Sequence, residues 1–404
     1  MAIFDKFQQL AATRQALSES GIQAISVVMD QVVSATEAVV NGQRVILAGT
    51  NNYLGLTFHP DCIEAACRAV RTQGTGTTGS RAANGSYSIH VQLERELADF
   101  LGRRGVIVFS TGYVANLGML STLAGPGDVF VIDGDSHASI YDGCRLSGAE
   151  VIRFRHNDPA DLEKRLRRLG ERTERTLIVV EGIYSMLGDR APLAEIAAVK
   201  RAYGGYLLVD EAHSLGVLGA TGRGLAEELG IEADVDLIVG TFSKSLGSVG
   251  GFCVSRHPEL ELMRYAIRAY VFTASLAPSV IASTRVALRI LREGTALRER
   301  LWRNVRHLYD GLAEAGLRVG PQPSPVIAVE VASKAEALIW WHQLMEAGVY
   351  VNLILPPATP TASCLLRCSL SAAHTPEQVD RIRKAFLDLP GAGVAAEPVL
   401  AASR

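Results

Sequence analysis

From about residue 60 onward, short apolar runs alternate with longer segments in which apolar residues recur at helical spacing. We expect the apolar runs to form buried β-strands over residues 105–109, 128–132, 150–154, 176–181, 206–210, 235–241 and 251–255. The segments between them predict helices over residues 60–73, 87–102, 112–124, 159–169 and 192–203. Strands separated by helices favour an α/β fold, with a mainly parallel seven-stranded sheet flanked by helices.

The two ends of the chain show different patterns. Apolar spacing within residues 1–20 predicts an amphipathic helix that packs on the protein body or on a second subunit, with membrane-surface contact as the alternative. Asn41-Gly42 predicts a hairpin over residues 39–47. A helical stretch over 278–315 leads into a smaller α+β pattern, with strands over 326–331, 349–353 and 364–370 and helices over 334–347 and 375–388.

These patterns divide the chain into four parts. Residues 1–58 hold the N-terminal helix and hairpin, and residues 59–285 form the large domain that we expect to carry the active site. Residues 286–389 form a small C-terminal domain. Residues 390–404 are rich in Ala, Gly and Pro, and we expect this tail to be disordered.

The overall charge excludes one large class of function. Lys and Arg total 40 and Asp and Glu total 42 among 404 residues, so the basic excess of a nucleic-acid-binding protein is absent. No long uncharged apolar stretch predicts a spanning helix, and the N-terminus lacks the pattern of a secretory signal. Six cysteines form no Cys-x-x-Cys pair and no metal-binding cluster with histidine. We therefore expect a cytoplasmic protein without a metal site.

Lys244 is the most informative single residue, because it follows the apolar run 235–241 in the segment Thr-Phe-Ser-Lys-Ser. An amine held at a strand tip can form a Schiff base with an aldehyde cofactor. Ser-Lys pairs are common in solvated loops, so the motif gains its weight from Asp210 and His213, which end another apolar run. Asp210 can pair with a protonated pyridine nitrogen and His213 can reach a phenolic oxygen, which indicates a pyridoxal phosphate (PLP) site. The alternative is that Asp210 only caps a turn.

Three further segments carry candidate site residues. Gly112 and Tyr113 follow the strand 105–109 at an expected helix start, which suits a phosphate or an ordinary cap. His137 follows the strand 128–132 and can stack on a flat cofactor ring, although a loop histidine is often only solvated. Arg367 lies in an apolar strand, where it needs an anion: a substrate carboxylate or a structural partner.

Taken together, three runs resemble the α-oxoamine synthases: 181–189, Asp-Glu-Ala-His-Ser at 210–214 and Thr-Phe-Ser-Lys-Ser at 241–245. The resemblance extends over roughly residues 20–388 and implies the type I fold of PLP-dependent transferases and a homodimer with active sites at the subunit interface. It also implies that Lys244, His137, Asp210 and His213 are catalytic. It assigns Thr241 and Ser243 to the cofactor, Thr273 to the phosphate of the neighbouring subunit, and Asn52 and Arg367 to the substrate.

Within that family, the runs 49–55, 137–144, 272–276 and 356–360 resemble the members that condense L-serine with a long-chain acyl thioester of coenzyme A or acyl carrier protein. That reaction releases CO₂ and a thiol, gives 3-ketosphinganine and begins sphingolipid synthesis. A lipid product leaves peripheral contact with the inner membrane face open. One departure from those members is Leu355, where arginine often precedes the Pro-Pro-Ala-Thr-Pro loop, so the handling of the acyl donor stays open.

Several alternatives remain at this point. The chain could join alanine to a pimeloyl thioester, or glycine to a short acyl group. It could also catalyse a different PLP reaction, such as transamination. A non-catalytic partner subunit is a further alternative, which the presence of Lys244, Asp210 and His137 disfavours.

Overall fold

The computed structural model describes residues 3–8, 11, 14–15, 26–356, 358–359 and 363–391. Contacts divide the chain into two compact units. The larger unit comprises residues 51–303 and 371–373, and the smaller one comprises residues 1–50, 304–370 and 374–404. The four-part domain division expected from the sequence stays a prediction. The expected disordered tail lies, from residue 392 on, outside the described residues, as does most of the expected helix over residues 1–20.

The larger unit is built on a seven-stranded sheet in the order β4-β10-β9-β8-β7-β5-β6. Its strands are β4 (Gly105–Phe109), β5 (Val129–Asp133), β6 (Glu150–Phe154), β7 (Thr176–Glu181), β8 (Tyr206–Asp210), β9 (Leu237–Thr241) and β10 (Gly251–Ser255). β5, β6, β7, β8 and β9 pair in parallel, and only β10 runs antiparallel to its two neighbours. The expected mainly parallel, helix-flanked sheet is therefore confirmed.

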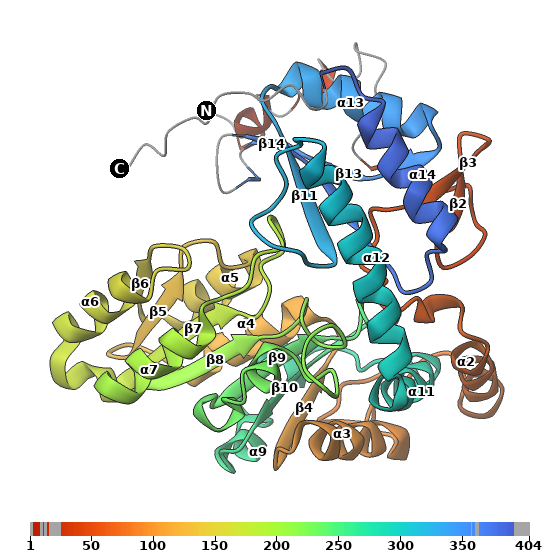
Figure 1. Cartoon of the computed structure of the whole chain (residues 1–404). Helices are drawn as coiled ribbons and strands as arrows, with labels where there is room; N and C mark the ends of the chain where they lie inside the picture. Colours follow the sequence, from red (N-terminus) through yellow and green to blue (C-terminus); the bar gives the residue numbers. More distant parts are fainter. Residues whose placement is uncertain are drawn as a thin grey trace. The chain divides into compact units, whose positions relative to one another are not determined.

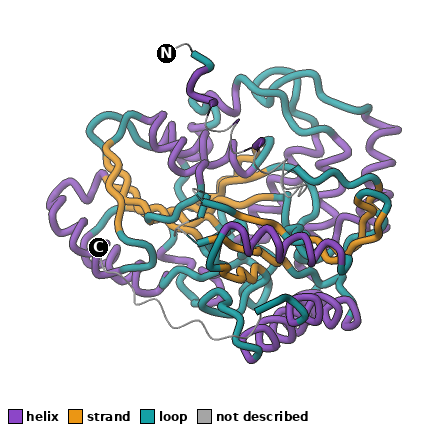
Figure 2. The backbone as a smooth tube through the Cα atoms, turned by 90° about the horizontal axis from the view of Figure 1, so that it is seen from above, coloured by secondary structure: helices purple, strands orange, loops and turns teal. Residues whose placement is uncertain are grey.

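Helices cover this sheet, so its central strands are buried on both faces. α4 (Gly112–Leu123) packs on β9 and β10 beside α5 (Ala138–Ser147), and α7 (Leu193–Tyr203) packs on β8 beside α6 (Pro159–Leu169) (Figure 1). Figure 2 shows the strands of the sheet in orange with purple helices around them. The hydrophobic core joins the sheet to α4 and α5, with Phe130, Ile132, Met119 and Ile140 fully buried. This rigid core fixes where the strand ends lie.

Two further helices of the larger unit, α2 (Pro60–Gln73) and α3 (Ser88–Leu101), lie where the sequence predicts them. The short helices α8 (Leu225–Glu228), α9 (Glu259–Met263) and α10 (Arg268–Val271) were not predicted. The single helical stretch expected over 278–315 is two helices, α11 (Pro278–Glu293) and α12 (Thr295–Glu314), because Gly294 interrupts it. The helix α5 is absent from the sequence prediction. Its only sequence signal is moderate amphipathicity after His137, which sits at its N-cap.

The smaller unit carries two small sheets. β1 (Gln31–Val32), β2 (Glu37–Val40), β3 (Gln43–Leu47) and β12 (Val349–Tyr350) form one, and β11 (Val326–Val331), β14 (Cys364–Ser369) and β13 (Asn352–Ile354) form the other. The helices α13 (Lys334–Glu346) and α14 (Pro376–Leu387) lie where the sequence predicts them. The Asn41-Gly42 turn joins β2 to β3 with positive φ at both residues, as a two-residue hairpin turn requires.

Short one-turn helices connect several elements: η1 (Asp5–Phe7), η2 (Leu56–Phe58), η3 (Gly170–Arg175) and η4 (Glu232–Asp234). Among the described residues, no helix combines the length and apolarity that a bilayer crossing requires. The described part of the chain also contains no cluster of three or more His, Cys, Asp or Glu side chains arranged to hold a metal ion.

Candidate active site

The carboxyl ends of β4, β5, β7, β8 and β9 lie along one edge of the central sheet (Figure 1). Residues at these strand ends surround a cavity of about 240 Å³. This volume is slightly below the usual range for ligand pockets, about 300–1,000 Å³, and suits one small ring compound. The cavity is lined by residues from these strand ends and the helices that follow them: Thr111, Gly112, Tyr113, Asn116, His137, Ser139, Glu181, Asp210, Ala212, His213, Gly240, Thr241, Ser243 and Lys244.

Lys244 lies in the tight connection between β9 and β10, which holds it at the cavity. Its neighbour Phe242 is fully buried and stacks on Phe252 of β10, with ring centroids 5.7 Å apart. On the other side, Ser245 is buried and its hydroxyl donates to the carbonyl of Leu215 at 2.6 Å. The Gly247 amide donates to the Lys244 carbonyl at 2.9 Å. Packing on both sides thus fixes the backbone that presents the amine.

Asp210 ends β8 and is held by two hydrogen bonds. The Asn116 Nδ2 amide donates to Oδ2 at 2.7 Å, and the backbone amide of Ala212 donates to Oδ1 at 2.9 Å. Both Asp210 and Asn116 are buried. The Asn116 Oδ1 oxygen, by contrast, is buried and makes no hydrogen bond to any described residue. These two donors fix the orientation of the Asp210 carboxyl group. A further polar group could still approach Asp210 and Asn116 from the cavity.

Glu181 ends β7 in direct register with Asp210, so two buried carboxyl groups stand side by side. Burial, reinforced by the negative charge of Asp210, raises the pKa of Glu181 well above its ordinary value. The backbone amide of His137 donates to Glu181 Oε1 at 2.5 Å. Glu181 thereby ties the His137 loop to the strand ends.

His137 caps the start of α5 and faces the cavity. Its Nδ1 accepts from the Ser139 amide at 3.2 Å and lies 2.8 Å from the Ser139 hydroxyl. Its ring lies edge-on to Tyr113, with centroids 6.5 Å apart. Desolvation lowers the pKa of the His137 imidazole, the charge of Asp210 opposes that change, and the charge of Lys244 adds to it. A neutral, positioned ring results, which suits stacking.

His213 is held from two directions. The Tyr53 hydroxyl lies 2.6 Å from His213 Nδ1. The loop itself is anchored by Glu211, which is fully buried and accepts from the amides of Leu225 and Ala226, both at 3.0 Å. Burial raises the pKa of Glu211, while the hydrogen bonds that it accepts act in the opposite direction. The buried carboxyl group therefore fixes the turn that carries His213.

The start of α4 offers a site for an anion. Thr111 caps this 12-residue helix by accepting from the Val114 amide at 3.1 Å, and the first amides of a helix have no partner within it. A Cβ on Gly112 would come within 2.9 Å of Thr241, so glycine is required for this approach. The hydroxyls of Thr241 and Ser243 lie 2.8 Å apart beside it. Amides and hydroxyls thus form a cradle suited to a phosphate group.

These features fit the predicted PLP. The cavity combines an amine, an oriented buried carboxylate, a flat neutral imidazole and a helix start, which are the groups that the aldehyde, pyridine nitrogen, ring and phosphate of this cofactor require. The sequence-predicted residues in the cavity are Gly112, Tyr113, His137, Asp210, His213, Thr241, Ser243 and Lys244. Their individual roles stay predictions.

Three predicted residues lie elsewhere. Thr273 lines a separate small hollow with Ser110 and Tyr270. Asn52 is buried, and its Nδ2 donates to the Thr57 hydroxyl at 2.8 Å. Arg367 is buried in β14 of the smaller unit, opposite Ala328 of β11. The roles predicted for these three residues stay predictions too.

Six lining residues of the cavity were not predicted as site residues from the sequence, and neither was Tyr53, which contacts His213: the six are Thr111, Asn116, Ser139, Glu181, Ala212 and Gly240. Glu181 carried a usable signal, because it is a carboxylate at the end of an apolar strand, like Asp210. Asn116 lies on α4 one turn beyond Gly112, which only a helix assignment can connect to the cavity. The contact between Tyr53 and His213 joins residues 160 positions apart and had no sequence signal.

A second polar cluster, consisting of Asp133, His156 and Asp189, braces the loops beside the cavity. His156 Nδ1 lies 2.8 Å from Asp133 Oδ1, and Nε2 lies 2.7 Å from Asp189 Oδ2. Asp135 Oδ2 lies farther away, 3.9 Å from His156 Nδ1. The ring of Tyr184 lies edge-on to the His156 ring, with centroids 4.6 Å apart. Burial alone would lower the pKa of His156, but the two close carboxylates outweigh it and raise the pKa to about 10. A charged imidazolium therefore joins the two loops.

Comparisons with known proteins agree with this arrangement. Residues 43–386 match the family model of class I and II aminotransferases. A serine palmitoyltransferase of Caulobacter vibrioides (strain NA1000 / CB15N) is 59% identical over 399 residues, covering 99% of both chains. An 8-amino-7-oxononanoate synthase of Geobacter metallireducens is 42% identical, covering 86% of this chain and 89% of its own. A solved structure of a serine palmitoyltransferase variant from S. paucimobilis with bound PLP–myriocin aldimine is 49% identical, with a TM-score of 0.95 over 98% of this chain and 100% of its own.

Proposed function

We propose that this chain is a PLP-dependent serine palmitoyltransferase. The premise is that it belongs to the class I and II aminotransferase family and, within that family, to the α-oxoamine synthases. It condenses L-serine with a long-chain acyl thioester to give 3-ketosphinganine, CO₂ and a free thiol, the first step of sphingolipid synthesis. The observation that carries the proposal is the convergence of Lys244, Asp210 and His137 on one cavity in a chain so similar to such enzymes.

The cavity residues would hold the cofactor by complementary groups. Lys244 would bind its aldehyde carbon, Asp210 its protonated ring nitrogen and His213 its phenolic oxygen, while the start of α4 with Thr241 and Ser243 would bind its phosphate. When bound, PLP supplies an electron sink that stabilises negative charge at the α-carbon of an amino acid. The hydrogen bond from Asn116 directs the Asp210 carboxyl group, which would hold the ring nitrogen in its protonated form.

Lys244 is the proposed base. Once released by the incoming amino acid, Nζ removes the Cα proton of L-serine, and the same amine returns a proton to Cα after the carboxylate has left as CO₂. His137 stacks on the ring and orients the serine carboxylate for that loss. Arg367 is proposed to bind the carboxylate, and Asn52 to border the substrate pocket.

The functional unit is proposed to be a homodimer, in which Thr273 of one protomer reaches the phosphate site of the other. Sedimentation of the purified protein should give twice the mass of one chain. In mixtures of Thr273→Ala and Lys244→Ala protomers, activity should return in heterodimers, because one of their two sites then combines an intact Lys244 with an intact Thr273. No recovery in confirmed heterodimers would contradict the shared site.

The proposed place of action is the cytoplasm, with peripheral contact at the inner membrane face. Ile3, Phe4 and Phe7 are all exposed at the N-terminus, and the product is a lipid. Flotation with vesicles of inner-membrane lipids should recover the full chain, and a triple Ser substitution of these residues should abolish the recovery. Equal flotation of both proteins would rule out this contact.

A substrate panel tests the reaction itself. The purified protein, loaded with PLP, is mixed with L-serine, L-alanine or glycine and with palmitoyl, pimeloyl or acetyl thioesters of coenzyme A and acyl carrier protein. Mass spectrometry should detect 3-ketosphinganine from serine and the palmitoyl donor, together with CO₂ and free thiol. A preference for alanine and the pimeloyl donor would instead assign the activity of the Geobacter relative, and release of a keto acid without CO₂ would indicate transamination.

A further inference from the structure

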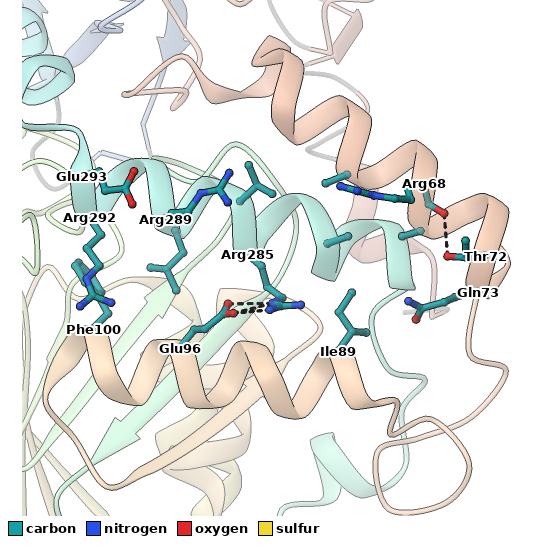
Figure 3. Close-up of a pocket in the computed structure, with 15 residues that line it drawn as sticks. Arg68, Thr72, Gln73, Ile89, Glu96, Phe100, Arg285, Arg289, Arg292 and Glu293 are labelled. Carbon is teal, nitrogen blue, oxygen red and sulfur yellow. Dashed lines mark hydrogen bonds and ion pairs between the residues drawn. The ribbon is translucent and has the colours of Figure 1, made fainter.

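A groove of about 660 Å³ lies between α2, α3 and α11 of the larger unit, and it shares no lining residue with the catalytic cavity (Figure 3). Its volume falls within the usual range for ligand pockets, about 300–1,000 Å³. Its walls come from all three helices: Ala65, Arg68, Ala69, Thr72, Gln73, Ile89, Glu96, Phe100, Ala282, Arg285, Val286, Leu288, Arg289, Arg292 and Glu293.

The floor of the groove is apolar. Ala65 and Ala69 of α2 and Ala282 of α11 are buried, and their small side chains leave open the space between the two helices. Ile89 and Phe100 of α3 are also buried and close the floor from below. Such a surface, narrow and lined by small or aromatic groups, fits an extended hydrocarbon chain better than a polar ligand.

The rim of the groove is basic. Arg68, Arg289 and Arg292 are exposed, and within the described part of the chain no hydrogen bond or ion pair to their guanidinium groups is found. In Figure 3, the side chains of Arg68 and Arg289 extend from facing helices toward the space between them. Arg285, by contrast, is neutralised by an ion pair with Glu96 at 2.5 Å, and it also donates a hydrogen bond to Gln92 Oε1 at 2.7 Å.

The local charge is therefore opposite to that of the whole chain. Four arginines face two glutamates around the groove, a net charge of +2, whereas the chain as a whole carries −2. Arginine binds carboxylate and phosphate groups bidentately, and it is less strongly hydrated than lysine. An apolar floor below unpaired arginines matches an amphiphile that carries one negative head.

We propose that this groove binds the anion of a long-chain fatty acid, with its hydrocarbon chain along the floor and its carboxylate between Arg68 and Arg289. A concave groove walled by three helices takes up one chain, whereas a bilayer surface would require exposed apolar side chains at the rim. The inference is independent of the proposed catalytic function, because the two sites have no residue in common.

Equilibrium dialysis of labelled palmitate against the PLP-loaded protein, below the concentration at which palmitate forms micelles, tests the proposal. A saturable site should appear, and Arg68→Gln/Arg289→Gln should weaken its affinity at least tenfold, because two charge-assisted contacts are lost. Both arginines are exposed, so this variant should fold like the wild type. The matched control Arg71→Gln/Arg300→Gln removes the same charge from exposed positions outside the groove and should leave binding unchanged.

Ligand and wall variants complete the test. Hexadecanol, which lacks the charge, and hexanoate, which lacks the long chain, should each bind far more weakly than palmitate. Val286→Trp, at a half-buried wall position, should block palmitate binding while the condensation activity persists. Palmitate binding that is unchanged by the paired arginine variant and by Val286→Trp would overturn the proposal. Arginine-dependent binding to anionic vesicles without fatty acid, but not to free palmitate, would overturn it in favour of a membrane surface.

Discussion

Two buried polar clusters lie beside each other at the strand ends of the larger unit, and they differ in how completely their charges are paired. In the cluster of Asp133, His156 and Asp189, one imidazolium joins two carboxylates at 2.8 and 2.7 Å. In the catalytic cavity, Glu181 and Asp210 are both acidic and adjacent, and the neighbouring Asn116 Oδ1 has no partner in the described structure. The brace holds a cation between its two carboxylates, whereas the cavity places two acidic groups side by side, which is typical of a functional site.

Substitution of Lys244 should have the largest effect, because it removes the only amine among the described residues that line the cavity. We expect Lys244→Ala to lower turnover by at least about 10³-fold and to eliminate the absorbance band at about 420 nm of lysine-bound PLP. Lys164→Ala, at an exposed position of α6, is the matched control and should keep both the turnover and the absorbance band. Substantial turnover in the Lys244 variant would refute its role as base.

The two adjacent carboxyl groups should respond differently to neutralisation. Asp210→Asn should lower kcat by about 100-fold, because an amide cannot hold the ring nitrogen in its protonated form. Glu181→Gln should lower it only a few fold, because the side-chain oxygen of Gln can still accept the hydrogen bond from the His137 backbone amide.

Steady-state kinetics of these two variants measure the difference directly. A loss in Glu181→Gln as large as that in Asp210→Asn would mean that both groups act as charges.

Removal of His156 should weaken folding more than chemistry. His156→Asn should lower the free energy of unfolding by about 2 kcal/mol, because charge-assisted hydrogen bonds to two carboxylates are lost. The folded-state pKa of about 10 lies above the ordinary value of 6.5. The stabilisation by His156 is therefore complete below about pH 6.5 and disappears as the pH rises through about 10.

Thermal unfolding of both proteins from pH 6 to 10 measures this effect, and their difference should shrink as the pH rises. His307→Asn is the control, since His307 pairs with Asp380 at an exposed site and should change stability by less than about 0.5 kcal/mol. A pH-independent difference for His156→Asn would show that the imidazolium charge does not contribute.

The smallest effect is expected from Tyr53→Phe, which removes the 2.6 Å contact to His213 Nδ1 and the 3.2 Å hydrogen bond to Asn51 Oδ1. Activity should fall a few fold and stability by about 1–2 kcal/mol, the usual cost of one or two hydrogen bonds. Tyr265→Phe, at a side chain that is 83% exposed, should change neither. Identical kinetics for Tyr53→Phe and the wild type would show that Tyr53 does not position His213.

The strands and most helices could be read from the sequence because each pattern is local. The strand Val129–Asp133 is apolar up to its last residue, as expected for a strand buried on both faces of a sheet. Local patterns missed the break at Gly294 because single glycines are tolerated in helices, and they missed α5 because it is only moderately amphipathic. They also missed α8, α9 and α10, which span only four or five residues each. These differences depend on packing, which a local pattern does not report.

By itself, the sequence determined the kind of chemistry, because Lys244, Asp210 and His213 each follow an apolar run and parallel strands bring such ends to one edge. Only the tertiary structure decided how these groups are tuned. The strand register places Glu181 against Asp210, which is 29 positions away in the sequence. The contact of Tyr53 with His213 joins residues 160 positions apart, and the bridge made by His156 joins residues 23 or more positions apart. Charge coupling depends on distance in space and on burial, and neither quantity is encoded in the spacing of residues along the chain.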